Sequence, residues 1–424
     1  MTEGQPNSAS LTHDASGSST GMAGLGQRGV EWWADDGGHS IHTPGGYEWW
    51  NFESMDAAGN GVVVTLFDGL PFHPYYGVQV ARWRRRHARA FTTPPPEVLP
   101  SHYPAVYIGI YQGGTRVAQA INVYPPGSFD CRPGLPELRV GPNRLTLRAD
   151  GSFGLVARAY GYDIHHGTPR ARRDLVLSAT LNFRPTFRGV QHVRPFRPAG
   201  VDGAAHTWVL AAPHGVMTGR VQFISEDDAI GPIDLALNAL GYHDHNYGQA
   251  ELIGAAGDTG PQHDGAGEGG RIKRLAAGHM LGPTYALVWQ RTAVGGRTGC
   301  RSDAIILFEQ DRAPIVIEAP AIVTEQMRTT RWLVKYPGRA TLHGSDAKGN
   351  SAELIVEHDG LVERSPFHVR LSARATFTIA GRQHYSGVGQ TTVLQLQRLG
   401  WPLLSDMVLM SLQSIAADDP LWRL

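Results

Sequence analysis

The sequence predicts an all-β protein built from antiparallel sheets. The chain has 424 residues, of which 52 are glycine and 28 are proline, and only 18% are charged. Glycine and proline mark turns, so this composition favours many short strands over a few long helices. Runs of strand length recur along the chain with no helical pattern between them, which indicates sheets that close as barrels or sandwiches.

The strand-like runs form two groups along the chain. The first group lies at residues 61–70, 105–114, 144–150, 154–162 and 174–183. The second group lies at residues 283–292, 303–310, 353–360 and 375–381. Each run has about the length of a strand, and several alternate apolar with polar residues. We therefore expect an N-terminal β domain at 29–235 and a C-terminal β domain at 236–400.

Two segments have the composition of flexible chain. Residues 1–28 are mainly Ser, Gly, Thr and Ala and offer little that could form a core, so we expect a disordered tail. The Gly-rich residues 254–270 predict a flexible insertion within the second domain.

Two further segments depart from the β pattern. The run RWRRRHAR (82–89) is basic, and we interpret it as a solvated edge or loop rather than a phosphate-binding patch, because the rest of the chain is not basic. Residues 401–424 are the best helix candidate. The apolar residues that recur there near helical spacing are Leu404, Met407, Val408 and Leu412. We expect this C-terminal helix to pack on a barrel or to lie on a membrane surface.

The composition argues against several classes of function. The 38 basic and 38 acidic residues balance, which gives no reason to expect a nucleic-acid partner. Two cysteines are too few for a disulfide framework or a Cys-rich zinc site. The sequence has no Gly-rich phosphate loop, G-x-S-x-G elbow or H-E-x-x-H motif. Because the chain opens without the pattern of a signal peptide and has no run of about 18 apolar residues, we expect a cytoplasmic location.

Two stretches place aromatic and polar side chains on a shared strand face. In YEWWNF, Tyr47, Trp49 and Asn51 share one face, because side chains alternate along a strand. In AHTWVLAAP, His206 and Trp208 are two residues apart and point the same way. Such residues form either a core or the wall of a cavity.

The stretch GYHDHNYG has the densest set of chemically active side chains. On a strand, Tyr242, Asp244 and Asn246 share one face, whereas His243 and His245 share the other. A regular strand therefore cannot offer a combined His-Asp-His metal site. The two histidines could still bind a metal with a third residue from elsewhere, but no second group of ligands is visible, and we expect no metal.

A fourth stretch, GHMLGPTYALVWQ, adds further aromatic residues. His279 precedes an expected strand on which Tyr285, Leu287 and Trp289 point to one side, as a cavity wall or as core. The residues that we predict to contact a substrate are Tyr47, Trp49, Asn51, Asn246, Tyr285 and Trp289.

These side chains suit acid-catalysed chemistry on a carbon–carbon double bond. Protonating an unactivated C=C bond requires a well-aimed acid in a dry pocket, and burial raises the pKa of a carboxyl group so that it carries a proton near neutral pH. Aromatic faces stabilise the resulting carbocation. A histidine can orient the acid or activate water. Asp244, Tyr242, His206 and Trp208 are residues of the required types.

Three motifs give the chain a resemblance to a known family. They are YEWWNF, H-T-W at 206–208 and G-Y-H-D-H-N-Y-G at 241–248, in this order. The chain resembles the carotenoid 1,2-hydratase (hydroxyneurosporene synthase) family, within a wider group of double-lipocalin-like proteins that includes polyene cyclases and Diels–Alderases. The resemblance spans roughly residues 30–400.

The resemblance implies two lipocalin-like antiparallel β-barrels around a hydrophobic cavity. It places the family's catalytic residues on His206, Trp208, Tyr242 and Asp244 and requires no cofactor. His243 and His245 fall on positions that vary in the family. The segment FHPYYG, the loop after residue 248 and the N-terminal tail depart from the family pattern.

The favoured function is a cofactor-independent hydratase that adds water to a C=C bond of an acyclic carotenoid or another isoprenoid. In this reading Asp244 donates the proton, Tyr242 is its hydrogen-bond partner, His206 positions the acid or activates water, and Trp208 faces the cation. The partners are a hydrophobic small molecule and water, with possible peripheral contact to a membrane. Two alternatives remain open: an isomerase or cyclase that quenches the cation or diene internally, and a non-catalytic carrier of a lipophilic ligand.

Overall fold

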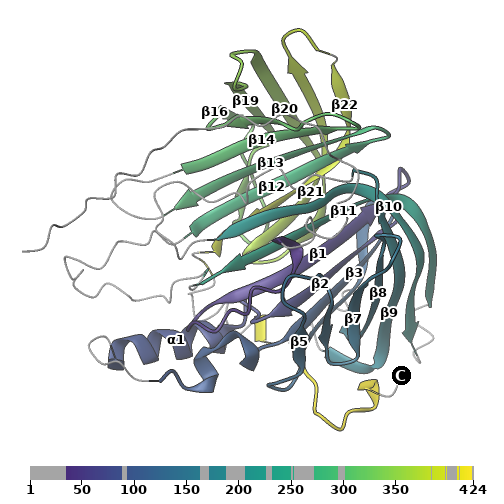
Figure 1. Cartoon of the computed structure of the whole chain (residues 1–424), viewed down its shortest axis with the longest axis vertical. Coiled ribbons are helices and arrows are strands. Elements are labelled where there is room, and N and C mark those ends of the chain that lie inside the picture. Colours follow the sequence, from purple (N-terminus) through teal and green to yellow (C-terminus); the bar gives the residue numbers. More distant parts are fainter. Residues whose placement is uncertain are drawn as a thin grey trace, which may run out of the picture.

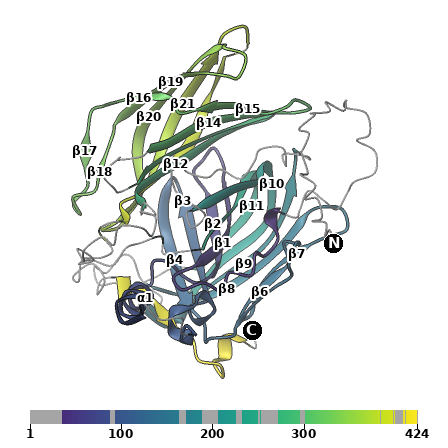
Figure 2. The same cartoon turned by 60° about the vertical axis from the view of Figure 1, so that its left-hand side comes forward.

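The protein is built from two large antiparallel sheets that pack against each other, as the computed structural model shows (Figures 1 and 2). The structure describes residues 35–87, 93–162, 171–187, 206–225, 232–249, 252, 272–294, 301–382, 384–396, 398, 408–409 and 411–422. The predicted tail at 1–28 and the predicted insertion at 254–270 lie outside these residues. Both sheets are strongly curled, so the all-β fold class with two barrel-like sheets is confirmed.

The first sheet contains 12 strands in the order β23-β4-β3-β2-β1-β11-β10-β9-β8-β7-β6-β5. The strands are β1 (Tyr47–Met55), β2 (Gly61–Asp68), β3 (Ala105–Gln112), β4 (Thr115–Val123), β5 (Phe129–Cys131), β6 (Leu138–Val140), β7 (Asn143–Leu147), β8 (Phe153–Tyr162), β9 (Ala171–Pro185), β10 (Thr207–Ser225), β11 (Ile233–Gly248) and β23 (Gln413–Ser414). A bridge between Gln119 and Tyr162 also joins β4 to β8 and closes part of this sheet into a ring.

The second sheet contains nine strands in the order β15-β14-β13-β12-β22-β21-β20-β19-β16. The strands are β12 (Ile272–Gly282), β13 (Tyr285–Val294), β14 (Arg301–Glu309), β15 (Ile315–Glu318), β16 (Ala321–Glu325), β19 (Arg339–Ser345), β20 (Ser351–Arg364), β21 (His368–Ile379) and β22 (Tyr385–Leu394). A separate pair, β17 (Arg328–Thr329) and β18 (Lys335–Tyr336), lies beside it.

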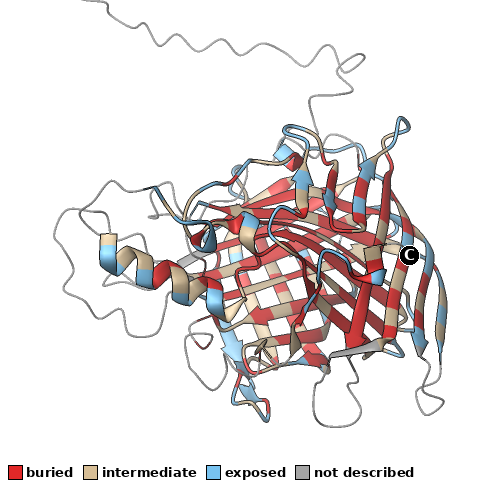
Figure 3. Cartoon of the chain, turned by 90° about the horizontal axis from the view of Figure 1, so that it is seen from below, coloured by how far each residue is buried: buried red, intermediate tan, exposed pale blue. Residues whose placement is uncertain are grey.

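Strand β1 is buried on both faces, and each face serves a different environment. Trp50 and Phe52 point into the main core of the first sheet, which they share with Val64 and Ile108. Trp49, on the opposite face, packs in a second cluster that lies towards the other sheet. The two faces of YEWWNF thus lie in different clusters, as its alternation predicts. Figure 3 shows the buried residues of the strands in red.

The first sheet extends past the boundary expected from the sequence. Strand β11 begins at Ile233 and pairs with both β1 and β10. It therefore belongs to the first sheet in full, although the expected division at 235/236 placed nearly all of it in the second domain. The change from one sheet to the other lies between β11 and β12. The pattern of apolar residues could not locate this change between sheets, because strand-like sequence continues on both sides of it.

A helix replaces the loop that we expected around the basic run. Helix α1 (Pro74–His87) buries Tyr76, Val80 and Ala81 on one side. Proline is favoured at a first helical position, and the basic residues of the last turn face the negative end of the helix dipole. Residues 82–87 of the basic run thus form the last turns of an amphipathic helix that lies beside the first sheet (Figure 1). Short 3-10 helices follow at Pro96–Val98 and Pro100–His102.

The C-terminal segment is not the continuous helix that we expected for 401–424. Residues 401–407 lie outside the described part, and helical conformation is present at 408–409 and 411. The chain then forms β23, which pairs in parallel with β4, and ends in a 3-10 helix at Pro420–Trp422. Leu421 is buried in the first core, whereas Val408 and Leu412 pack in the second cluster with Trp49. Within the described residues, no helix has the length and apolarity needed to cross a membrane.

Closure of the first sheet depends on the side chain of Asn122. The Asn122 amide donates to the carbonyl of Tyr160 at 2.8 Å, and the Tyr160 backbone N–H donates to the Asn122 carbonyl oxygen at 2.8 Å. This fully buried amide thus replaces backbone pairing where β4 meets β8.

We expect Asn122→Ala to destabilise the protein by about 2 kcal/mol, because it leaves two buried backbone groups of Tyr160 unpaired. Thermal unfolding followed by circular dichroism measures this loss. Gln112→Ala, at the exposed end of β3, is the control and should change stability by less than about 0.5 kcal/mol. An unchanged melting temperature of the Asn122 variant would contradict the role of this side chain.

Candidate active site

A cavity of about 460 Å³ lies between the two sheets and receives side chains from both. This volume is within the range of small-molecule sites. Strands β1, β2, β10 and β11 form one wall, and β12, β13, β20, β21 and β22 form the other. Phe72, from the segment before α1, also lines the cavity, and α1 packs behind Trp49.

Strand register arranges the wall of the first sheet in rows. Asp244, Asn51, Thr65 and Tyr107 are successive cross-strand neighbours and all line the cavity. The next row on one side contains Trp208, Asn246, Trp49 and Phe67, and the next row on the other side contains Tyr242, Glu53 and Val63. The row of Asp244 therefore lies between an aromatic row and a row that carries a second carboxylate.

Asp244 accepts two hydrogen bonds on one of its oxygens. The indole N–H of Trp208 donates to Asp244 Oδ2 at 2.7 Å, and the hydroxyl of Tyr242 donates to the same oxygen at 2.9 Å. Asp244 Oδ1 is buried and has no hydrogen-bond partner among the described residues. Burial raises the pKa of Asp244, against the opposing effect of the two hydrogen bonds. The acidic proton is therefore expected on Oδ1, the oxygen left free.

Tyr242 connects Asp244 to a histidine from the second sheet. The ring of His279 stacks on that of Tyr242, with centroids 4.6 Å apart and planes 2° apart. Nε2 of His279 lies 3.0 Å from Glu53 Oε1. Burial lowers the pKa of His279, although Glu53 opposes this shift. The imidazole is thus neutral at pH 7 and is held by a carboxylate.

Histidine His206 lies beside the aromatic row. Its Nδ1 is 3.1 Å from the Tyr47 hydroxyl, and its ring centroid is 5.5 Å from that of Trp49. Burial lowers the pKa of His206 to about 4, although a hydrogen bond with Asn246 opposes the shift. His206 is therefore a neutral side chain that lines the cavity. Tyr47 supports it from outside the cavity lining.

The structure brings most of the predicted site residues together. His206, Trp208, Tyr242 and Asp244 all line the cavity, and so do Trp49, Asn51 and Asn246. Three predicted contact residues, Tyr47, Tyr285 and Trp289, do not. Tyr47 lies behind the lining, where its hydroxyl contacts His206. Tyr285 and Trp289 pack in the interior of the second sheet, and the opposite face of β13, with Val288 and Gln290, points to the first sheet. Both faces of this strand are apolar, so alternation could not identify the cavity side.

His243 and His245 point away from the cavity, as their alternation with Asp244 predicts. His243 Nε2 lies 3.1 Å from an Asp36 carboxylate oxygen, and His245 Nε2 lies 2.9 Å from Glu48 Oε1. His39 Nδ1 lies 2.7 Å from the same Glu48 oxygen. Within the described residues, His39, Glu48 and His245 are close enough to share a metal ion, and a nitrogen of each histidine contacts the same Glu48 oxygen. They form a buried polar network behind the site.

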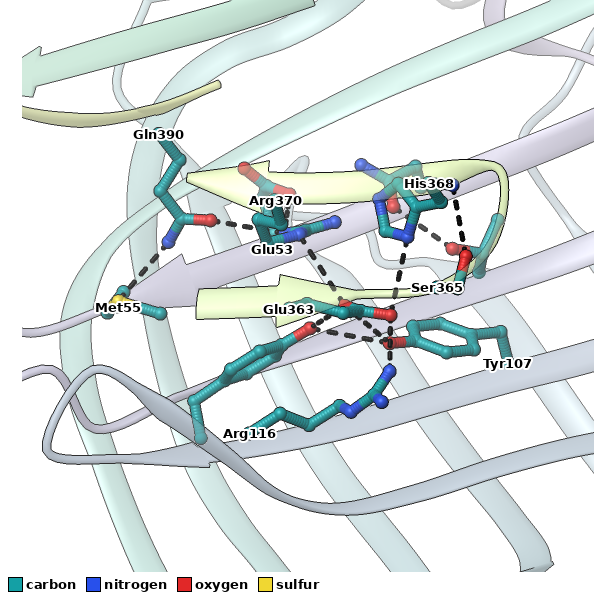
Figure 4. Close-up of polar contacts among 12 residues, drawn as sticks. Glu53, Met55, Tyr107, Arg116, Glu363, Ser365, His368, Arg370 and Gln390 are labelled. Atoms are coloured by element: carbon teal, nitrogen blue, oxygen red, sulfur yellow. Dashed lines mark hydrogen bonds and ion pairs between the residues drawn. The ribbon is translucent and has the colours of Figure 1, made fainter. Parts of the chain in front are cut away.

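A buried network of charges lines part of the cavity, and Figure 4 shows its contacts. Arg370 donates to Glu53 at 2.8 Å and to the Gln390 carbonyl oxygen at 3.2 Å. Glu363 pairs with Arg116. Glu53 and Arg116 belong to the first sheet, whereas Glu363, Arg370 and Gln390 belong to the second, so the network joins the two sheets.

Glu363 is the centre of this network. It also accepts hydrogen bonds from the hydroxyls of Tyr111 at 2.9 Å and Tyr107 at 3.3 Å. Burial alone would raise the pKa of Glu363, but Arg116 and His368 outweigh burial and hold it well below its ordinary value. The carboxylate is therefore charged and fully paired.

Sequence reasoning missed every site residue from the second sheet. His279, Gln290, Glu363 and Arg370 line the cavity, yet no local pattern connects them with Asp244. One signal was available for the first sheet: the alternation of Trp49 and Asn51 continues to Glu53, which also lines the cavity.

No protein-family model matches the chain. Hydroxyneurosporene dehydrogenase of Chlorobaculum tepidum is 25% identical to it over 346 residues, which cover 80% of each protein. The chain is a distant relative of this protein. The relation to the hydroxyneurosporene dehydrogenase agrees with the resemblance that three motifs indicate.

Two solved structures also resemble the chain. The match to CghA covers 85% of this chain and 94% of CghA, at 12% sequence identity and with a TM-score of 0.45. The match to kievitone hydratase from Nectria haematococca covers 85% of this chain and 95% of that protein, at 10% sequence identity and with a TM-score of 0.45. Both similarities are weaker than the relation to hydroxyneurosporene dehydrogenase.

We expect Glu363→Gln to destabilise the protein by about 3–5 kcal/mol, because it leaves buried arginines without their counter-charge. The depressed pKa means that Glu363 contributes stability above its unfolded pKa and loses it as the pH falls. The difference between wild type and variant should therefore shrink in acid, as measured by chemical denaturation across pH. Glu357→Gln, at a half-exposed position of the same strand, is the control. A variant as stable as this control would contradict the role of the network.

Proposed function

We propose that the protein is a cofactor-independent enzyme that protonates a C=C bond of a hydrophobic polyene or isoprenoid and adds water to it. The observation that supports this best is the environment of Asp244. One oxygen accepts both available hydrogen bonds, and the other is buried, unpartnered among the described residues and part of a cavity-lining side chain. A carboxyl group with a raised pKa in this arrangement is an aimed proton donor.

Aromatic residues next to Asp244 suit the charge that protonation creates. Trp49, Trp208 and Phe67 lie in the neighbouring row, and indole rings are the best aromatic partners of a cation. Addition of the Asp244 proton to one alkene carbon leaves a carbocation at the other. The Asp244 carboxylate then remains hydrogen-bonded to Trp208 and Tyr242, which stabilise its negative charge.

His279 is the base that we assign to the water step. Its Nε2 is occupied by Glu53, so a neutral imidazole with the proton on Nε2 leaves Nδ1 as the acceptor. Water attacks the carbocation and loses a proton to His279, and Glu53 stabilises the imidazolium that forms. Return of this proton to Asp244 completes the cycle, with one water added to the substrate. His206 contacts the Tyr47 hydroxyl and the ring of Trp49, and it serves to shape the aromatic end.

The distant relative supports the substrate class. Its name, hydroxyneurosporene dehydrogenase, refers to a hydroxylated acyclic carotenoid. The partly apolar cavity is consistent with a ligand of this kind, since Phe67, Leu70, Phe72 and Leu275 line it.

Asp244→Asn should reduce turnover by about 10²–10⁴-fold, because an amide cannot donate the required proton. The assay incubates the protein with acyclic polyenes in ¹⁸O-labelled water and analyses products by mass spectrometry. Asp234→Asn, at an exposed position of the same strand, is the matched control. Activity retained in Asp244→Asn would refute the acid assignment. A product of unchanged mass would instead identify an isomerase or cyclase, and unaltered ligand would identify a carrier.

The dependence of turnover on pH should be bell-shaped. Activity should fall as the pH rises through the raised pKa of Asp244, because the acid loses its proton, and as the pH falls through the lowered pKa of His279, because the base gains one. His279→Gln should slow turnover and remove the acidic limb of the profile. An acidic limb that persists in this variant would show that another group is the base.

A further inference from the structure

One polar side chain of the cavity has no assigned role in the reaction. Gln290 of β13 lines the cavity and is only 1% exposed. Its amide nitrogen donates to Thr292 Oγ1 at 3.0 Å, whereas its amide oxygen has no hydrogen-bond partner among the described residues. A buried polar group left unpaired is unfavourable, so this oxygen marks a position where a ligand group gains affinity.

The neighbours of Gln290 leave space for such a group. Its cross-strand neighbours are Ala277 and Ala304, whose side chains are a single methyl group. On the same face of β13, Ala286 and Val288 pack against Trp208 and Tyr242. Gln290 therefore lies one step along β13 from Val288, which packs against the two residues that hold Asp244, and it belongs to the opposite wall of the cavity.

A row of this wall that begins beside Gln290 is largely polar. Cross-strand register continues it from Ala277 to Thr392, Arg370 and Glu363, and all of these residues line the cavity. Arg370 Nε likewise has no hydrogen-bond partner among the described residues. The second sheet thus presents hydrogen-bonding groups to the cavity, next to apolar residues such as Leu275.

The chemistry of Gln290 selects a hydroxyl group. Thr292 pairs with one polar atom of the amide, so the other atom faces the ligand, whichever way the amide is turned. A hydroxyl group both donates and accepts and can pair with either atom. An anion is disfavoured, because the carboxamide is neutral and the buried charges of Arg116 and Arg370 are balanced by Glu363 and Glu53.

We propose that Gln290 binds a hydroxyl group that the substrate carries before the reaction, so that the substrate is a neutral polyene or isoprenoid alcohol rather than a hydrocarbon. This inference rests on the proposed function for the lipophilic nature of the ligand. It assigns the second sheet to recognition of the substrate oxygen and the first sheet to protonation of the double bond.

A binding measurement tests this assignment without turnover. Quenching of tryptophan fluorescence gives the dissociation constants of geranylgeraniol and of the C20 hydrocarbon in which a methyl group replaces CH₂OH, in identical detergent micelles. Wild type should bind the alcohol roughly tenfold more tightly or better. Equal affinities would overturn the proposal, and tighter binding of the C20 carboxylic acid than of the alcohol would overturn the neutral assignment.

Substitution of Gln290 locates the preference. Gln290→Met should reduce the ratio of the two dissociation constants to about one, whereas Gln112→Met at an exposed site should leave it unchanged. A preference that persists in folded Gln290→Met would overturn the assignment. If this variant does not fold, the wild-type comparison still decides whether a hydroxyl group is recognised. In Asp244→Asn the preference for the alcohol over the hydrocarbon should remain. A failure of the acid assignment and a failure of the hydroxyl site can therefore be distinguished.

Discussion

The ionic contact between the two sheets is the interaction on which the site depends. Glu53 and Arg116 on the first sheet pair with Arg370 and Glu363 on the second, and all four line the cavity. Buried charges are stable only when paired, so this network fixes how the sheets face each other. The position of His279 relative to Asp244, and hence any cooperation between an acid and a base, follows from this packing.

The second constraint is the double use of strands β1 and β11. One face of each strand faces the interior of the first sheet, where Trp50 and Phe52 pack beside the network of His243, His245 and Glu48. The other face forms the cavity wall with Trp49, Asp244 and Asn246. Alternation of side chains thus separates a structural polar cluster from a reactive one within eight consecutive residues.

The two sheets contribute different side chains to the cavity. The first sheet offers aromatic rings and a carboxyl group with a raised pKa, which suit protonation of a double bond and stabilisation of a cation. The second sheet offers an imidazole, an amide and a guanidinium group, which suit water activation and recognition of an oxygen atom. In the proposed reaction the acid comes from the first wall and the base from the second.

The sequence by itself determined the β class, the faces of YEWWNF and GYHDHNYG, and the grouping of Tyr242 with Asp244, because each depends only on alternation along one strand. It did not reveal helix α1 or the end of the first sheet at β11. It also did not reveal the inward packing of Tyr285 and Trp289, because apolar residues on both faces of a strand carry no directional signal. The tertiary structure alone decided the opposite wall. Sheet packing places His279, Gln290 and Arg370 in the same cavity as Asp244, and residues that meet only across two sheets leave no pattern at short range.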